Sequence, residues 1–547
     1  MSPSFTLPSA DTSNELVTVY NERIEGIRDE QYPMLKGKIY LDHGGTTLYA
    51  KSLVRKFSDD LISNLYGNPH SASTPSTLAG DRVDEIRIRA LHFFNADPDH
   101  FDLIFVSNAT AAIKLVAESF RDYPLLSENK RSKGFWYGYH RDAHTSLVGV
   151  REITHGSHWC FRDDEEVNQW IHRSKNGAKV KIGPLKGQIG LFAFPGQSNM
   201  TGRRLPMTWP SELRSKKGAK IYTLLDAAAL ATTCPINLSN EEAPDFTCIS
   251  FYKIFGFPNI GALIVRKEAG HMLQRRKYFG GGTVDMIISL GATWHAKKES
   301  SLHDRLEDGT LPFHSIFALG HALDVHQQLF ESMSRISAHT AYLAKQLFDG
   351  MSALTHYNGL PVCRIYRDPE AIYGNPKTQG ATIAFNILKP DGALVKFNEI
   401  EKSANDNGIY IRAGGLCNPG GIATFLQFDA SRLKAAFAAG HRCSQPLVTI
   451  DGRPIGVVRV SLGAMSTLSD INTLLTFLRK NYVAESLSSE LQSSSKSSIN
   501  DLVIIHEKTT HAISTAKTGK VRKQWINYLI SLVRTKKDVD NHPRVSP

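Results

Sequence analysis

The chain of 547 residues is poor in cysteine, and its six cysteines lie far apart and form no CxxC pair. Disulfide frameworks and zinc sites need paired or closely spaced cysteines, so we expect neither, and no metal. No apolar stretch approaches the roughly 18 residues that span a bilayer, and the N-terminus lacks a basic segment followed by an apolar one. We therefore expect a cytoplasmic protein with no transmembrane segment.

A concentrated block of positive charge is missing as well, although the formal net charge is +11. The excess of Lys and Arg is diffuse, and no RNA-binding signature or metal-finger spacing accompanies it in the body of the chain. We expect no nucleic-acid partner. A mildly basic body suits an anionic cofactor or substrate.

Short apolar runs alternate with helical patterns, which is typical of an α/β fold whose sheet is covered on both faces. Four runs predict strands: LIFVS at 103–107, GLFAFP at 190–195, IYTLLD at 221–226 and FTCIS at 246–250. Three polar residues lie at or just past strand ends: Asn199, Asp226 and Lys253. Because ligands in open α/β sheets bind at that edge, these residues are candidates for a site.

The segment after the first predicted strand has the features of an anion site. Asn108 is a natural N-cap for a helix over 108–120, and the first N–H groups of such a helix, with the Thr110 hydroxyl, can hold a phosphate. Asp226 is a second signal, since a carboxylate at the end of an apolar strand is costly unless it meets a cation or caps a helix. Capping alone would explain it equally well.

Lys253 stands alone in the otherwise apolar run ISFYKIFGFPNIGALIV, residues 249–265. Burial lowers the pKa of a lysine, and a partly neutral amine can form a Schiff base. The alternative is a lysine whose stem crosses apolar surface while its head reaches water. Together with the carboxylate and the phosphate cradle, the lysine favours pyridoxal 5'-phosphate (PLP), which carries a phosphate, a basic ring nitrogen and an aldehyde.

An ordered set of motifs over residues 36–482 carries a resemblance to a known family. The set comprises YLDHGGTTLY (40–49), YGNPHS (66–71), HTS (144–146), FPGQSNMTG (194–202), LLDAAAL (224–230), SFYKIFGFP (250–258), FGGGTV (279–284), RLEDGTLPF (305–313), IRAGGLCNPG (411–420) and VRVSLGAMSTLSD (458–470). It resembles class V aminotransferase-fold PLP enzymes. Within them it is most similar to the N-terminal cysteine desulfurase domain of eukaryotic molybdenum cofactor sulfurases.

The resemblance implies cofactor-binding roles at matching positions. Lys253 would hold PLP through a Schiff base, Asp226 would bind the pyridinium nitrogen, and His144 would stack on the ring. The phosphate would be held by the segment at Ala109 and Thr110, by Ser250, and by Thr310 of a second subunit in a homodimer.

The resemblance also implies how L-cysteine is handled. Asn199 would lie near the ring hydroxyl and the substrate, Arg459 would bind the substrate carboxylate in a bidentate pair, and Cys417 would accept the sulfur. Glycines at 414, 415, 420 and 421 would let the Cys417 loop move. Cys443 is a less convincing second candidate.

The expected fold is a fold type I large domain with a mostly parallel sheet and a smaller α+β C-terminal domain. We expect an N-terminal segment (1–35), the PLP-binding domain (36–315), the small domain (316–484), and a Ser-rich linker with a basic tail (485–547).

The expected activity is that of a PLP-dependent cysteine desulfurase that forms L-alanine and a persulfide, with a separate molybdenum cofactor-binding protein as a possible acceptor. A related PLP-dependent lyase or aminotransferase of specialised metabolism is the alternative. A non-catalytic scaffold is a third, which the intact set of site residues disfavours.

Overall fold

The computed structural model describes residues 19–123, 134–172, 182–216, 220–442, 447, 449–450 and 452–485. Described residues up to Thr355 and from Pro361 to Tyr482 form one compact unit. His356–Leu360 and the described residues 483–485 belong to a second one, in which Tyr357 N donates to Ala484 O at 2.9 Å. The predicted linker and tail beyond residue 485 lie outside the described residues, as does Cys443.

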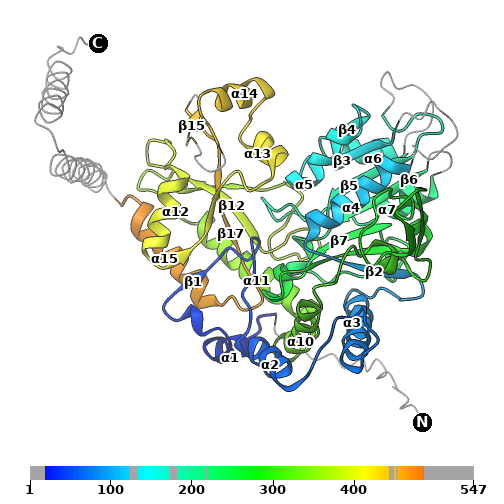
Figure 1. Ribbon diagram of the computed structural model, residues 1–547. Coiled ribbons are helices and arrows are strands. Elements are labelled where there is room, and N and C mark those ends of the chain that lie inside the picture. The colour runs from blue at the N-terminus through cyan, green and yellow to red at the C-terminus, as the bar shows by residue number, and fades with distance from the viewer. Residues whose placement is uncertain are drawn as a thin grey trace, which may run out of the picture. The chain divides into compact units, whose positions relative to one another are not determined.

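The compact unit contains a seven-stranded sheet (Figure 1). Its order is β2 (Phe101–Val106), β8 (Gly261–Arg266), β7 (Phe246–Ser250), β6 (Ile221–Asp226), β5 (Gly190–Pro195), β3 (Trp136–His140) and β4 (His158–Phe161). Neighbours pair in parallel except β8, which is antiparallel to both β2 and β7. All four predicted strands are present, and the mostly parallel sheet was predicted correctly.

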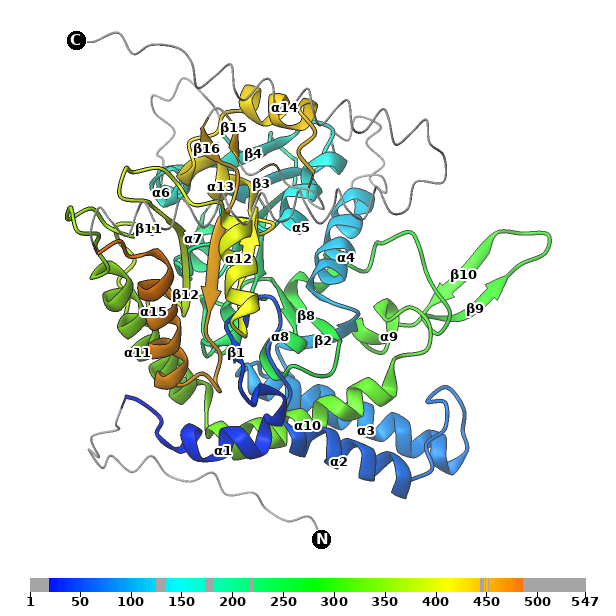
Figure 2. The same cartoon turned by 90° about the vertical axis from the view of Figure 1, so that its left-hand side faces the viewer.

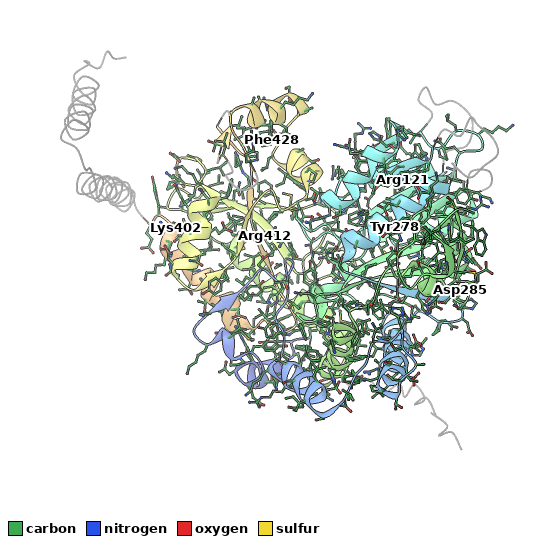
Figure 3. The ribbon with its side chains drawn as sticks, viewed as in Figure 1. Arg121, Tyr278, Asp285, Lys402, Arg412 and Phe428 are labelled. Atoms are coloured by element: carbon green, nitrogen blue, oxygen red, sulfur yellow. The ribbon has the colours of Figure 1, made fainter. Side chains whose placement is uncertain are left out.

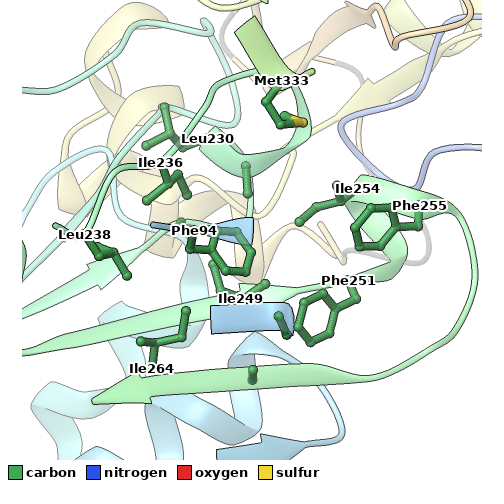
Figure 4. Packing of buried hydrophobic residues seen from close by; sticks show 14 of the residues in the cluster. Phe94, Leu230, Ile236, Leu238, Ile249, Phe251, Ile254, Phe255, Ile264 and Met333 are labelled. Carbon is green, nitrogen blue, oxygen red and sulfur yellow. The ribbon is translucent and has the colours of Figure 1, made fainter. Parts of the chain in front are cut away.

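Both faces of this sheet are buried. Successive residues of a strand point to opposite faces, and neighbouring residues pack in two different hydrophobic clusters. On β5, Phe192 packs in one hydrophobic cluster and Leu191 in the other. The first cluster contains residues of α3 (Thr74–Phe93) and α10 (Phe313–Phe330), and Figure 4 shows part of it. The second contains one face of α4 (Ala109–Asp122). The near-continuous apolar strands of the sequence reflect this double coverage.

This part of the chain contains further helices. They are α2 (Lys51–Ser63), α5 (Thr145–Val148), α6 (Asp164–His172), α7 (Trp209–Ser215), α8 (Tyr252–Phe255) and α9 (Leu302–Leu306). The hairpin β9 (Val284–Ile288) and β10 (Trp294–Lys297) extends away from the sheet in Figure 2. Its apolar side chains are exposed, with Leu290 at its turn 90% exposed.

A second, four-stranded antiparallel sheet lies in the C-terminal part of the chain. Its order is β11 (Cys363–Tyr366), β12 (Thr382–Ile387), β17 (Val457–Ser461) and β14 (Arg412–Gly414). It is accompanied by α11 (Met333–Ser352), α12 (Phe397–Asp406), α13 (Pro419–Phe425), α14 (Ala430–Ala438) and α15 (Leu468–Tyr482). The predicted boundary at residue 315 falls inside α10, so the division into domains stays a prediction.

The N-terminal part of the chain joins this second region. The strand β1 (Ile39–Tyr40) pairs in parallel with β13 (Ile409–Tyr410), and Asp42 forms a bridge with Ser461 at the end of β17. The helix α1 (Arg23–Gln31) is tied there by an ion pair of 2.7 Å between Arg28 and Asp470. Within the described ranges, no helix is long and apolar enough to span a membrane, and no three His, Cys, Asp or Glu side chains form a group that could hold a metal ion.

Candidate active site

A cavity of about 830 Å³ lies beyond the ends of strands β2, β5, β6 and β7. The residues predicted from separate motifs that line it are Ala109, Thr110, His144, Asn199, Asp226, Ser250 and Lys253. A larger cavity of about 1010 Å³, lined in part by Arg204 and Cys234, contains none of the predicted site residues. The smaller cavity is therefore the candidate active site.

One end of the cavity is the N-terminus of α4. As predicted, Asn108 is its N-cap, and Asn108 Oδ1 accepts from Ala111 N at 3.0 Å. Ala109 N donates to Ser250 Oγ at 3.2 Å, and the hydroxyls of Thr110 and Ser146 are 2.8 Å apart. Backbone N–H groups and hydroxyls at a helix N-terminus suit an anion such as a phosphate.

The backbone of β8 approaches this helix terminus closely. A Cβ added to Gly261 would lie 2.7 Å from Asn108 Cα and 2.6 Å from the Ile249 carbonyl oxygen. Such contacts are shorter than any real Cβ makes, so glycine is required here for packing. The position of the anion end depends on this contact.

Asp226 and Lys253 both line the cavity. Asp226 ends β6, is 7% exposed, and accepts a hydrogen bond from Ala228 N at 3.1 Å. Lys253 lies on the short helix α8 after β7. Burial lowers the pKa of Lys253 below its ordinary value; the positive charge of Arg459 lowers it further, whereas Asp226 raises it. Burial thus favours the neutral, nucleophilic form of the Lys253 amine, even though a carboxylate is close by.

His144 presents a neutral imidazole to the same space. It is the N-cap of α5, and its Nδ1 accepts from Ser146 N at 3.2 Å, so the neutral ring carries its proton on Nε2. Burial lowers the pKa of His144, and the positive charge of Lys253 acts in the same direction. An uncharged ring can stack on a flat ligand without the cost of desolvating a cation.

Arg459 does not line this cavity. It is 2% exposed on β17, its Nη2 is 2.5 Å from Asp42 Oδ1, and its Nη1 donates to Asn199 O at 2.8 Å. Arg412 on β14 is its partner in the strand pairing and is labelled in Figure 3. Residues paired across antiparallel strands point to the same face, so two guanidinium groups lie together near the site.

Cys417 also lies outside the residues that line the cavity, but its loop contacts several of them. Thr145 N, next to His144, donates to Cys417 O at 3.1 Å, and Asn199 Nδ2 donates to Leu416 O at 2.7 Å. The thiol is partly exposed. Two glycines expected to give this loop freedom have another role: an added Cβ at Gly420 would lie 2.1 Å from Arg141 O, and at Gly421 it would lie 2.7 Å from Asn418 Oδ1.

Thr310 is exposed and is not among the residues that line the cavity of its own chain. Sequence reasoning missed several polar residues that do line it, among them Ser146 and Gln197. Ser146 Oγ is 2.9 Å from His144 Nδ1, and it could have been noticed as the last residue of the HTS motif. Gln197 stands in FPGQSN, directly before the predicted Asn199 segment.

Comparison with known proteins gives this geometry a family. The model of the aminotransferase class-V family matches residues 39–131 and 181–431. The chain belongs to this family. The predicted membership is therefore confirmed.

Among curated relatives, molybdenum cofactor sulfurase of Aspergillus niger is 54% identical over 468 residues, which are 85% of this chain and 55% of the relative. That of Emericella nidulans is 51% identical over 479 residues, 87% of this chain and 55% of the relative. The chain thus spans about half the length of the curated relatives it matches.

A solved structure confirms the fold class. A cysteine desulfurase from Thermococcus onnurineus has a TM-score of 0.63 at 19% identity and covers 84% of this chain and 98% of that one. At this identity the likeness concerns the fold alone. The expected α/β architecture with a mostly parallel sheet is correct.

Proposed function

We propose that the protein is a PLP-dependent cysteine desulfurase that converts L-cysteine to L-alanine and leaves the sulfur as a persulfide on Cys417. The observation that carries the proposal is the single cavity that brings Lys253, Asp226 and the N-terminus of α4 together. Its relatives named molybdenum cofactor sulfurase support the molybdenum cofactor as the destination of the sulfur.

The residues of the cavity fit PLP. Ala109, Thr110 and Ser250 offer backbone N–H and hydroxyl groups to its phosphate, and the buried Asp226 carboxylate suits a protonated ring nitrogen. Lys253 supplies the amine and His144 a flat neutral ring. When bound, PLP supplies an aldehyde that takes up amines and a conjugated ring that accepts electron density from the substrate Cα.

The protein residues have separate tasks in the reaction. Lys253 would remove and return protons at the substrate carbon, and burial, by lowering its pKa, favours the neutral amine that acts as a base. Arg459, buried beside Asn199, orients the substrate carboxylate. The buried Asp226 would be the partner of the ring nitrogen, and a carboxylate beside that nitrogen favours the protonated ring.

Sulfur transfer is the task of Cys417. Its thiolate attacks the sulfur of the substrate, so that an S–S bond forms, the Cβ–S bond breaks, and the carbon receives a proton to become the methyl group of alanine. No external oxidant is needed, because the carbon is reduced as the two sulfurs become a persulfide.

We also propose a homodimer in which Thr310 completes the phosphate site of the partner. The exposed apolar hairpin β9–β10 supports this, since Met286, Ile287, Leu290 and Trp294 are each at least 49% exposed and need a covering surface.

The described cysteines are free thiols, which suits a reducing compartment such as the cytoplasm; they are Cys160, Cys234, Cys248, Cys363 and Cys417. The sulfur then passes to a molybdenum cofactor-binding acceptor.

One experiment separates a desulfurase from another PLP-dependent lyase or aminotransferase. The purified holoenzyme is incubated with L-cysteine, and alanine and protein persulfide are measured together. We expect equal amounts of both in the first turnover, no persulfide in Cys417→Ser, and normal persulfide in the control Cys160→Ser. Cofactor absorbance should be unchanged in Cys417→Ser. Full persulfide formation by Cys417→Ser, or no alanine from the wild type, would refute the proposal.

A further inference from the structure

The loop that carries Cys417 has an unusual backbone. Leu416 and Cys417 are consecutive non-glycine residues with φ of 55° and 54°, in the left-handed region that favours glycine. Such residues persist only when surrounding contacts hold them. The contacts that hold these two residues are therefore informative about how the thiol is positioned.

Both strained residues have their carbonyl oxygens fixed by neighbours of the cavity. Asn199 Nδ2 donates to Leu416 O at 2.7 Å, and Thr145 N donates to Cys417 O at 3.1 Å. The Leu416 side chain is 4% exposed and packs in a hydrophobic cluster with Met200 and Ile422. The thiol thus sits on a backbone that is held from both sides.

Asn418 connects these contacts. Its side chain is fully buried, and Oδ1 accepts from Gly421 N at 2.8 Å as the N-cap of α13. Its Nδ2 donates to Asn199 Oδ1 at 2.9 Å and approaches Asp142 O at 3.3 Å and Ser198 Oγ at 3.4 Å. The acceptor half of the amide serves the helix, and the donor half reaches across to the cavity wall.

We propose that the Asn199–Asn418 amide pair is a latch that fixes Cys417 in its strained conformation and sets its position for sulfur transfer. Asn418 is thus a positioning residue. Only its effect on sulfur transfer rests on the proposed function. Asn199 contacts both the thiol loop and the arginine: its side-chain amide donates to the loop, and its backbone oxygen accepts from Arg459. The substrate-binding arginine and the thiol loop are therefore joined through one residue.

A simple N-cap would explain only half of these contacts. An aspartate or serine caps a helix as well as asparagine, but neither can donate from the position of Nδ2. If capping were the whole role, Asn418→Asp would be silent. If the latch exists, Asn418→Asp keeps the cap for α13 and loses the donor to Asn199, which leaves an oxygen facing an oxygen.

The test compares Asn418→Asp and Asn418→Ser with the control Asn405→Ala, an exposed position on α12. The first readout is the rate at which iodoacetamide alkylates Cys417 in the holoenzyme, followed by mass spectrometry of its peptide. Each lost hydrogen bond of ordinary strength should raise this rate about fivefold, because the strained loop opens more often. The control should match the wild type.

The second readout is the single-turnover rate of persulfide formation. A misplaced thiol should slow it by about 10- to 100-fold, while the Kd for cysteine and the cofactor absorbance stay unchanged. Asn418→Ser decides the matter if Asn418→Asp fails to fold. Unchanged alkylation and transfer rates in a folded variant would overturn the latch. Faster alkylation in the variants, with no persulfide in the wild type, would uphold the latch and refute the desulfurase proposal.

Discussion

The wall of the cofactor cavity and the Cys417 loop are built in different ways. The wall residues Asp226, Ser250 and Lys253 stand at or just after the ends of neighbouring strands, so the sheet itself brings them together. The Cys417 loop has a left-handed backbone and is held by side-chain amides. These amides join residues more than 200 positions apart. The wall should tolerate changes in loops, whereas the thiol position should depend on single hydrogen bonds.

The largest expected effect concerns the wall. Lys253→Ala should abolish covalent attachment of PLP and all alanine formation, since the proposed nucleophile and base are lost together. Borohydride reduction of the wild type followed by peptide mapping should place the pyridoxyl group on Lys253. The exposed Lys434 is the matched control, and Lys434→Ala should keep both attachment and activity. A pyridoxyl group on any other lysine would refute the assignment.

The next effect tests whether Arg459 belongs functionally to the wall. Losing a charge-assisted carboxylate contact costs about 1.5–3 kcal/mol, so Arg459→Ala should lower kcat/KM for cysteine by roughly 10- to 100-fold, mainly through KM. The strand neighbour Arg412 provides the comparison, because it lies on the same face but forms no ion pair with any described carboxylate. If Arg412→Ala raised KM and Arg459→Ala did not, Arg412 would be the carboxylate ligand.

A smaller effect concerns the protonation of Lys253 in the cofactor-free protein. Because burial lowers the pKa of Lys253, competitive labelling of its amine should titrate below the range of ordinary lysines. Asp226 opposes this shift by favouring the ammonium form, so Asp226→Asn should move the midpoint to still lower pH. The exposed Lys434 should titrate normally in both proteins. A midpoint that rises in Asp226→Asn would contradict this account.

The smallest effect tests a contribution from a second subunit. Thr310→Ala should weaken PLP binding by about fivefold, the loss of roughly one hydrogen bond, as measured by equilibrium dialysis. Trp294→Asp on the exposed hairpin should produce monomers in sedimentation velocity together with weaker PLP binding. A monomeric Trp294→Asp protein with wild-type PLP affinity would show that Thr310 serves no partner site.

Most of the wall could be predicted from sequence, and the physical reason is local. Asp226 ends one apolar strand, and Lys253 follows soon after Ser250, which ends the next. Residues at such positions can be predicted as site residues, because the ends of parallel strands meet at one edge. The N-cap at Asn108 was likewise visible in its own segment. The resemblance added roles for His144 and Asn199, which the strand pattern alone does not assign.

The remainder depended on contacts that sequence spacing does not encode. Neither the ion pair of Arg459 with Asp42 nor the link from Asn418 to Asn199 can be read from local patterns, because each joins segments more than 200 residues apart. The glycines at 420 and 421 were interpreted as sources of flexibility. Their Cβ positions are in fact filled by Arg141 and Asn418 atoms, and that packing appears only when the segments meet.

The bare backbone at Gly261 has a consequence for cofactor choice. With no side chain there, Asn108 lies directly against β8, so the spacing between the helix terminus and Asp226 is a dimension of the sheet. A ring with its phosphate arm must match that dimension, and altering the side chains of the cavity leaves it unchanged. Even Gly261→Ala would lengthen it by displacing α4. The fold itself therefore limits the size of the phosphorylated ring that the cavity can hold, whichever side chains contact that ring.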